Sequence, residues 1–193
     1  MVIGITGGVG CGKSTVLSLL EQKCKARLLI ADEIGHQVMR AGTEVNRAIG
    51  QKFGREVIRP DGEVDRERLA SMIYAEDSRR EELNAIIHPC VRKEIEKKLK
   101  EWKQEPLIVL ETAILFETGC DRFCHSVWGI VADREVRIGR LMESRGYSRE
   151  KSESIMDTQL LDEEWAKRCD CLIDNNGDRK KLWIQVQELL GRL

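Results

Sequence analysis

Gly7-Gly8-Val9-Gly10-Cys11-Gly12-Lys13-Ser14 is the stretch from which the fold of this chain can be predicted. It fits the pattern G-x-x-x-x-G-K-S of a phosphate-binding loop, or P-loop. The apolar run Val2–Thr6 before it predicts a strand, and apolar residues at helical spacing after it predict a helix. A glycine-rich turn that fits the pattern by chance would not need this strand–loop–helix setting, so we favour the P-loop.

The residue types of this stretch suit phosphate binding. Glycines allow successive backbone N–H groups to point inward, and the start of the following helix adds unpaired N–H groups and a favourable dipole. Lys13 is expected to reach the β- and γ-phosphates of ATP, and the Ser14 hydroxyl is expected to bind Mg²⁺. The predicted ATP-binding residues of the loop are Gly8, Gly10, Cys11, Gly12, Lys13, Ser14 and Thr15.

Composition narrows the class of protein. The chain has 193 residues, with 32 Lys and Arg against 33 Asp and Glu, for a net charge of −1. Such a balance argues against a nucleic-acid binder that works by bulk charge. No apolar run approaches the roughly 18 residues of a membrane span. We expect a cytoplasmic protein that does not bind a membrane. We also expect it to be a monomer or a weak homo-oligomer.

Short apolar runs separated by helical patterns predict the fold class. Beyond the first strand, we expect strands at 27–31, 107–110, 126–131 and 171–173. Continuous apolar strands of this kind are typical of a parallel sheet covered by helices on both faces. We therefore predict one α/β domain over 1–193, a P-loop NTPase of the nucleoside-monophosphate-kinase type. Its ligands should bind at the carboxyl ends of the strands.

The long connection after the second strand predicts an inserted region. About 75 residues separate the second and third strands, far more than one crossover helix needs. Thr43 and Asp65 are expected to cap two helices, Leu83, Ile86 and Ile87 mark a third, and Pro89 suits the first turn of a long helix. We interpret residues 33–104 as a helical substrate-binding insertion.

The segment 134–160 differs from the rest because it is rich in arginine. Arg134, Arg137 and Arg140 recur every third residue, and Arg145 and Arg149 follow. Arginines at this spacing share one broad side of a helix. Beside a P-loop they suit a lid that closes over a polyphosphate. The alternative is a solvated basic face paired with Glu135 and Glu143.

Two acidic residues end predicted strands. Asp32 follows the second strand, and it would face the γ-phosphate if that strand neighboured the first. A carboxylate there can accept a proton from an attacking hydroxyl; the alternative is a helix N-cap. Glu111 ends the third strand, where it would serve Mg²⁺ or its waters, or border the substrate; the alternative is a surface carboxylate.

The remaining candidates stay open at this stage. Arg66 is weighed as a ligand of a substrate phosphate against a surface ion pair, and His88 as a substrate contact against a structural histidine. His36 and His125 have no partner visible in the sequence and are interpreted as structural.

The chain has seven cysteines, without the spacing of a disulfide scaffold or of two zinc knuckles. Reduced packing thiols are favoured over structural zinc. Cys11 lies at a helix start beside Lys13, and both features lower a thiol pKa. We expect it to be the most oxidation-sensitive cysteine.

Taken together, the motifs resemble those of the dephospho-coenzyme A kinase family over nearly the whole length. The matching segments are Gly4–Thr15, Ile30–His36, Asp61–Leu69, Ile86–Pro89, Thr112–Glu117, Arg140–Gln159 and Cys169–Gly177. The P-loop alone is generic, but the ordered set is specific. The departures are Ile30 and Glu111, where the family has Asp, and Ala113, where it has Pro.

The resemblance implies that ATP phosphorylates the ribose 3′-hydroxyl of dephospho-CoA to give CoA and ADP, the last step of CoA biosynthesis. It also implies Lys13, Asp32 and Arg140 as catalytic residues, Arg137 as an ATP-binding residue of the lid, and Asn175 as a neighbour of the adenine of ATP. Dephospho-CoA would bind to Asp32, Arg66, His88, Glu111, Leu115 and Phe116. The alternatives are a P-loop kinase for another small acceptor and, less favoured because N-K-x-D is absent, a regulatory NTPase.

Overall fold

The computed structural model describes residues 1–159 and 162–193, which form two compact units. The first unit comprises Met1–Leu29 with Gln104–Leu193, and the second comprises Ile30–Lys103. The second unit falls on nearly the same residues as the insertion predicted at 33–104. Residue 160, the end of the predicted lid, lies outside the described residues.

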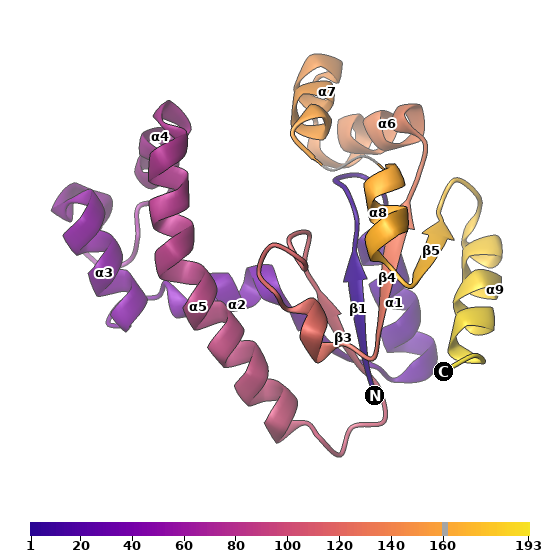
Figure 1. Ribbon diagram of the computed structural model, residues 1–193. Coiled ribbons are helices and arrows are strands. Elements are labelled where there is room, and N and C mark those ends of the chain that lie inside the picture. The colour runs from indigo at the N-terminus through magenta and orange to yellow at the C-terminus, as the bar shows by residue number, and fades with distance from the viewer. Residues whose placement is uncertain (160–161) are drawn as a thin grey trace. The chain divides into compact units, whose positions relative to one another are not determined.

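A five-stranded parallel sheet is the centre of the first unit (Figure 1). In chain order the strands are β1 (Val2–Thr6), β2 (Arg27–Ile30), β3 (Ile108–Glu111), β4 (Ser126–Val131) and β5 (Cys171–Asp174). They lie in the order β2-β3-β1-β4-β5. The register places Ile5 of β1 opposite Glu111 on one side and Trp128 on the other. The predicted sheet is therefore confirmed, with strand ends shifted by one residue in places.

Alternation along β1 distributes its side chains between the two faces of the sheet. Ile3 and Ile5 are fully buried in a core with Trp128 and Ile130, against helices α1 (Lys13–Cys24) and α9 (Arg179–Leu190). The opposite face of β1 is covered closely by the loop after β3, since a Cβ on Gly4 would lie only 3.0 Å from Leu115 Cδ2. Figure 1 shows α8 (Asp162–Arg168) on this second face. Both faces are thus covered, as expected for a parallel sheet.

The strand order differs from the one on which the placing of Asp32 depended. β3 lies between β2 and β1, so the second strand does not neighbour the first. The argument that Asp32 faces the γ-phosphate by direct adjacency of these two strands is therefore wrong. Parallel strands that are not consecutive in the chain can be neighbours in a sheet, and the long connection between β2 and β3 allows this arrangement.

Two helices follow β4 and form the arginine-rich segment. They are α6 (Arg134–Arg145) and α7 (Arg149–Asp157), and Figure 1 shows them beyond the carboxyl ends of β1 and β4. Ile138, Leu141 and Met156 form a small core between them. Met142, in the same helix as Leu141, is 47% exposed and lies outside this core. The 3₁₀ turn Asp121–Phe123 precedes β4.

The second unit is helical. Its elements are α2 (Ala31–Val38), α3 (Glu44–Phe53), a 3₁₀ turn (Arg55–Val57), α4 (Arg66–Ala75) and α5 (Asp77–Glu101). Thr43 and Asp65 cap α3 and α4 by accepting bonds from Asn46 N and Arg68 N, which confirms both predicted caps. Helices α2, α3 and α4 pack on α5 around a separate core that includes Ile49 and Phe53.

The long helix α5 corrects the prediction for Pro89. We expected a short helix before Pro89 and a new helix starting there, but a single 25-residue helix runs through it. The missing N–H of Pro89 and its ring disfavour an interior position. Packing outweighs that cost, because Leu83 before it and Val91 and Ile95 after it are all buried.

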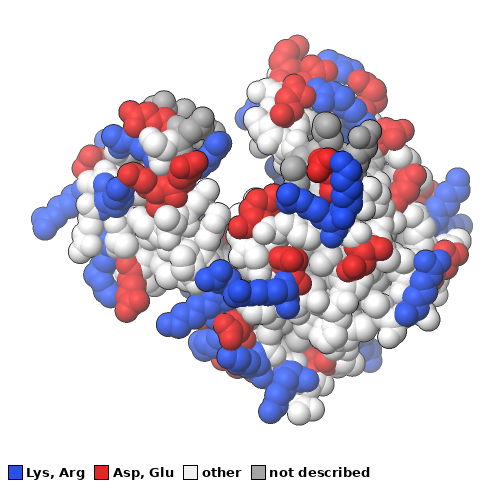
Figure 2. All heavy atoms as spheres, in the orientation of Figure 1, with Lys and Arg blue, Asp and Glu red and all other residues white. Residues whose placement is uncertain are grey.

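Charged side chains of both signs are interspersed over the face of the molecule shown in Figure 2. This mixed surface agrees with the net charge of −1. Among the described residues, none of the helices combines the length and the apolar character needed to span a membrane.

Candidate active site

The P-loop connects β1 to α1, as the sequence predicts. Gly12 stands just before α1 in the left-handed region, with φ of 91°. A Cβ at Gly12 would overlap the Asn175 amide nitrogen, so both the backbone angle and the close contact require glycine there. The first N–H groups of α1 have no partners within the helix and are directed out of its amino end. This end of the loop has the geometry of an anion site.

Lys13 is held over the loop by carbonyl oxygens and by one carboxylate. Its Nζ donates to Gly7 O at 2.9 Å and lies 3.8 Å from Glu111 Oε1. The two side chains are only 17% and 11% exposed, so water screens this ion pair less than a surface pair. The end of β3 thus brings an acidic group next to the lysine, through the pairing of β3 with β1.

The carbonyl oxygen of Cys11 accepts hydrogen bonds from two side chains. Asn175 Nδ2 donates to it at 2.8 Å, and Arg140 Nη1 donates at 3.4 Å. Arg140 also donates through Nη2 to Asn175 O at 2.7 Å. Two residues predicted separately, one from the lid and one after β5, therefore meet at the same turn of the P-loop.

Arg137 lies on the other side of the loop from Arg140. It is only 7% exposed, and its Nε donates to Val9 O at 2.8 Å. Its Nη2 donates to Gln159 Oε1 at 3.2 Å, and the same oxygen accepts from Val9 N at 2.8 Å. The guanidinium of Arg137, which was predicted to bind ATP, is bonded here to the backbone of the loop and to Gln159, and the contact with ATP stays a prediction.

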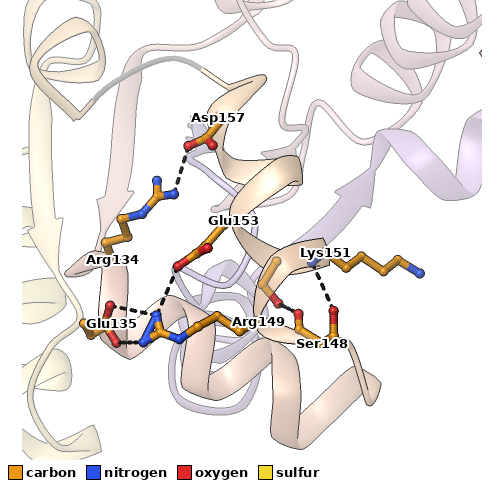
Figure 3. A network of polar contacts seen from close by, with 8 residues as sticks. Arg134, Glu135, Ser148, Arg149, Lys151, Glu153 and Asp157 are labelled. Carbon is orange, nitrogen blue, oxygen red and sulfur yellow. Dashed lines mark hydrogen bonds and ion pairs between the residues drawn. The ribbon is translucent and has the colours of Figure 1, made fainter.

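Arg134 and Arg149 are exposed, and they form ion pairs within the helix pair on what we call its outer surface (Figure 3). Arg149 pairs with Glu135 and Glu153, and Arg134 pairs with Asp157 at 2.9 Å. The hydrogen bond to Glu153 and the charge of Glu135 raise the pKa of Arg149 above its ordinary value. For Arg134 and Arg149 the alternative of a solvated, ion-paired face is therefore correct.

Ser14 and Thr15 occupy the first turn of α1. Ser14 is exposed, and Thr15 N donates to Gly12 O at 3.0 Å, which starts the helix. The exposed Ser14 hydroxyl and the Glu111 carboxylate are the oxygen groups at this end of the sheet that suit a hard cation.

The thiol of Cys11 does not behave as the sequence suggests. The side chain is 1% exposed and packs in the core of the first unit. A reagent has no access to it in the folded chain, so the expectation that it is the most oxidation-sensitive cysteine is wrong. Burial also raises the pKa of Cys124 to about 12 and that of Cys169 to about 11, which keeps both thiols protonated and disfavours them as zinc ligands.

The loop after β3 carries the two apolar residues expected to contact dephospho-CoA. Leu115 is fully buried, so it supports the loop and has no surface for a substrate, which corrects that prediction. Phe116 is partly exposed, and its ring lies 6.2 Å from that of Trp165. The Arg168 guanidinium lies 5.5 Å from the Phe116 ring on its face.

The helical unit has a polar cavity of about 780 Å³ of its own. Arg66, which the sequence analysis singled out, lines it at the start of α4. His36, Arg40 and Arg59 line it too, together with Glu63, Asp65 and Glu67. His36 was interpreted as structural, but it is exposed at this cavity, and neither Arg40 nor Arg59 was singled out.

Asp32 and His88 also belong to this unit. Asp32 is the second residue of α2, exposed, and it is not the N-cap, which is Ile30. The capping alternative for Asp32 is therefore wrong. His88 lies in the middle of α5 rather than at a helix start, and burial lowers the pKa of its imidazole.

The sequence of this chain is similar to those of known proteins. A family model described as dephospho-CoA kinase matches residues 1–181. The chain belongs to the dephospho-CoA kinase family. A dephospho-CoA kinase of Symbiobacterium thermophilum is 38% identical over 188 residues, covering 96% of this chain and 78% of the relative. One of Geobacter sulfurreducens is 37% identical over 193 residues, covering 99% and 98%.

A solved structure agrees with the fold. The crystal structure of TT1252 from Thermus thermophilus superposes with a TM-score of 0.85 at 30% identity, covering 100% of this chain and 97% of that one. Membership of the dephospho-CoA kinase family therefore extends over both units of the chain.

Gln159 is a further functional candidate that sequence reasoning missed. It appeared only as the last residue of the lid pattern, yet it contacts both the P-loop and Arg137. Its place two residues beyond α7, in the same segment as the lid arginines, was the available signal.

Proposed function

We propose that this chain transfers the γ-phosphoryl group of ATP to the ribose 3′-hydroxyl of dephospho-CoA, giving CoA and ADP. The observation that carries the proposal is the P-loop with Lys13 at its centre, in a chain of the dephospho-CoA kinase family. A P-loop accounts for the nucleotide, and the family accounts for the acceptor.

In this proposal the nucleotide is bound by the first unit. Backbone N–H groups at the start of α1 bind the phosphates, with Lys13 moving from the Gly7 carbonyl to the β- and γ-oxygens. Arg140, already at the Cys11 carbonyl, offsets charge on the transferring group. Asn175 borders the adenine, and Arg137 acts through the backbone of the loop.

Mg²⁺ is part of the proposal, with ATP as co-substrate. The donors fit a hard cation, since Ser14 presents a hydroxyl and Glu111 presents a carboxylate within 3.8 Å of Lys13 Nζ. The ion would neutralise charge on the β- and γ-phosphates. Glu111 also holds Lys13 in place before the nucleotide binds, a role that does not depend on the metal.

The acceptor is assigned to the helical unit. Arg66, Arg40, Arg59 and His36 surround a cavity large enough for a polyphosphate group, and guanidinium groups bind phosphate oxygens well. His88 and the partly exposed Phe116 are kept as further acceptor contacts. Asp32 is proposed as the base that orients and deprotonates the 3′-hydroxyl.

A coupled assay of ADP release with a panel of acceptors tests the reaction. Dephospho-CoA should stimulate release far above nucleoside monophosphates and shikimate. Stimulation by one of those instead would make the chain a kinase for another small acceptor. Release without any acceptor, unaffected by dephospho-CoA, would favour a regulatory NTPase.

Asp32→Asn tests the base. The change is close to isosteric and removes the proton acceptor, so kcat should fall by about 10²- to 10⁴-fold with the Kd for ATP nearly unchanged. The matched control is Glu33→Gln, the neighbouring acid in the same turn of α2. A near-normal kcat for Asp32→Asn would remove the residue from the base role.

The seven cysteines are all free, which suits a reducing compartment. On this basis we propose a cytoplasmic enzyme, active as a monomer or a weak homo-oligomer, with small-molecule substrates and no nucleic-acid partner.

A further inference from the structure

The backbone of one P-loop residue, Val9, is held through both its N–H and its C=O by the arginine-rich segment. Val9 N donates to Gln159 Oε1 at 2.8 Å, and Val9 O accepts from Arg137 Nε at 2.8 Å. Arg137 and Gln159 are joined in turn through the 3.2 Å bond between Nη2 and Oε1. The two side chains come from α6 and from just beyond α7, so a closed ring of three bonds links these elements to the loop.

Apolar packing also holds Val9 in place. The Val9 side chain packs against the small core of Ile138, Leu141 and Met156 between α6 and α7. At the preceding residue, a Cβ on Gly8 would overlap Arg137 Nη2 and lie 3.1 Å from Gln159 Oε1. Gly8 is therefore needed for close approach of these two side chains.

The burial of Arg137 shows why the ring is not an incidental surface contact. Its residue exposure is 7%, and a buried guanidinium costs free energy unless its N–H groups are bonded. Gln159 Oε1 satisfies one donor of Arg137 and, at the same time, the N–H of Val9. Loss of this single oxygen would remove one bond from each of these two partly buried donors.

We infer that Gln159 and Arg137 are positioning residues that hold the P-loop in its phosphate-binding shape by clamping the backbone N–H and C=O of Val9. Val9 immediately precedes Gly10, Cys11 and Gly12, whose backbone leads into the N–H groups at the start of α1. Catalysis by oriented N–H groups needs them fixed to within a fraction of an ångström before the substrate arrives. The clamp supplies that order, and neither side chain needs to touch the nucleotide.

The inference rests on the proposed function only for the expected change in kcat/KM for ATP. The clamp itself concerns the loop and any nucleotide that binds there. Hydrogen exchange of the loop amides and the affinity for Mg·ADP are therefore the primary measurements, and both remain informative if the acceptor is not dephospho-CoA.

The decisive pair of variants is Gln159→Leu and Gln159→Glu. Leucine keeps the approximate volume and removes the acceptor, whereas glutamate keeps an oxygen that can accept from both Val9 N and Arg137. Gln159→Leu should speed exchange of the Val9 amide about tenfold or more, and lower the affinity for Mg·ADP and kcat/KM for ATP each about tenfold. Gln159→Glu should stay within about threefold of the unaltered chain.

Arg149→Ala is the matched control, because it breaks ion pairs of the same two helices away from the loop. It should leave the exchange of residues 8–11 and the affinity for Mg·ADP unchanged. Wild-type exchange and affinity in Gln159→Leu would overturn the inference. So would equal effects of Gln159→Leu and Arg149→Ala, since these would indicate general loosening of α6 and α7.

Discussion

The two surfaces of the α6–α7 pair carry the same residue type and do different things. On the inner surface, Arg137 and Arg140 bond to carbonyl oxygens of Val9 and Cys11 in the P-loop. On the outer surface, Arg134 and Arg149 pair with acids of α6 and α7 (Figure 3). The sequence placed all four in one predicted lid. Partners and burial separate them, because a helix has two sides and only one meets the loop.

The comparison also separates two inner arginines that sequence reasoning grouped together. Arg137 is buried and bonds to the Val9 carbonyl, whereas Arg140 is partly exposed beside Asn175. A buried, bonded guanidinium is suited to holding structure, and a partly exposed one is suited to meeting a ligand. We therefore expect Arg137 to position the loop and Arg140 to act in catalysis.

The largest effect is expected at the P-loop itself, which the inner surface of the α6–α7 pair contacts. Lys13→Ala removes the charge aimed at the β- and γ-oxygens and leaves Glu111 without this partner. We expect kcat/KM for ATP to fall by about 10³-fold or more. Steady-state kinetics with saturating acceptor measures this. An effect smaller than that of Arg140→Ala would break the ranking of groups by their contact with phosphate.

Next in size is the contrast between the inner and outer arginines. Arg140→Ala should lower kcat by about 10²-fold, because charge stabilisation in the transition state is lost. Arg134→Ala, on the outer surface of the same helix, should change kcat by less than about twofold, since exposed ion pairs contribute little. Equal losses would show that the two surfaces are not functionally distinct.

The smallest effect concerns an ionisable group that is partly buried in the helical unit. Burial lowers the pKa of His88 below its ordinary value of 6.5. The unfolded chain therefore binds this proton more readily, and stability is lost as the pH falls below about 6.5.

We therefore expect the Tm of the unaltered chain to fall more between pH 7.5 and pH 5 than that of His88→Gln. Thermal unfolding followed by circular dichroism at matched ionic strength measures the difference. Parallel pH profiles for the two chains would show that His88 does not carry this dependence.

Local patterns predicted most elements well because their causes are local. The P-loop, the strand at 126–131 and the caps Thr43 and Asp65 depend on residues within a few positions of each other, and all are as expected. Pro89 was the failure of this kind. Its local preference for a helix start was outweighed by burial along the rest of α5.

The site was less predictable where contacts cross the chain. Gln159 lies 150 residues from Val9, and His36 shares its cavity with Arg59 and Arg66 only after the helices of that unit pack. Leu115 and Cys11 were placed at the site by motif, but their side chains turned into the core. A motif fixes the path of the backbone more firmly than the direction of each side chain.

The sequence by itself determined the phosphate-binding loop, the parallel sheet and the family, because glycine placement, apolar runs and ordered motifs are local properties of the chain. The tertiary structure decided the order of the strands, the partner of each arginine and the clamp on Val9. These depend on which distant surfaces are buried against each other, and burial turns a solvated charge into one that must find a partner.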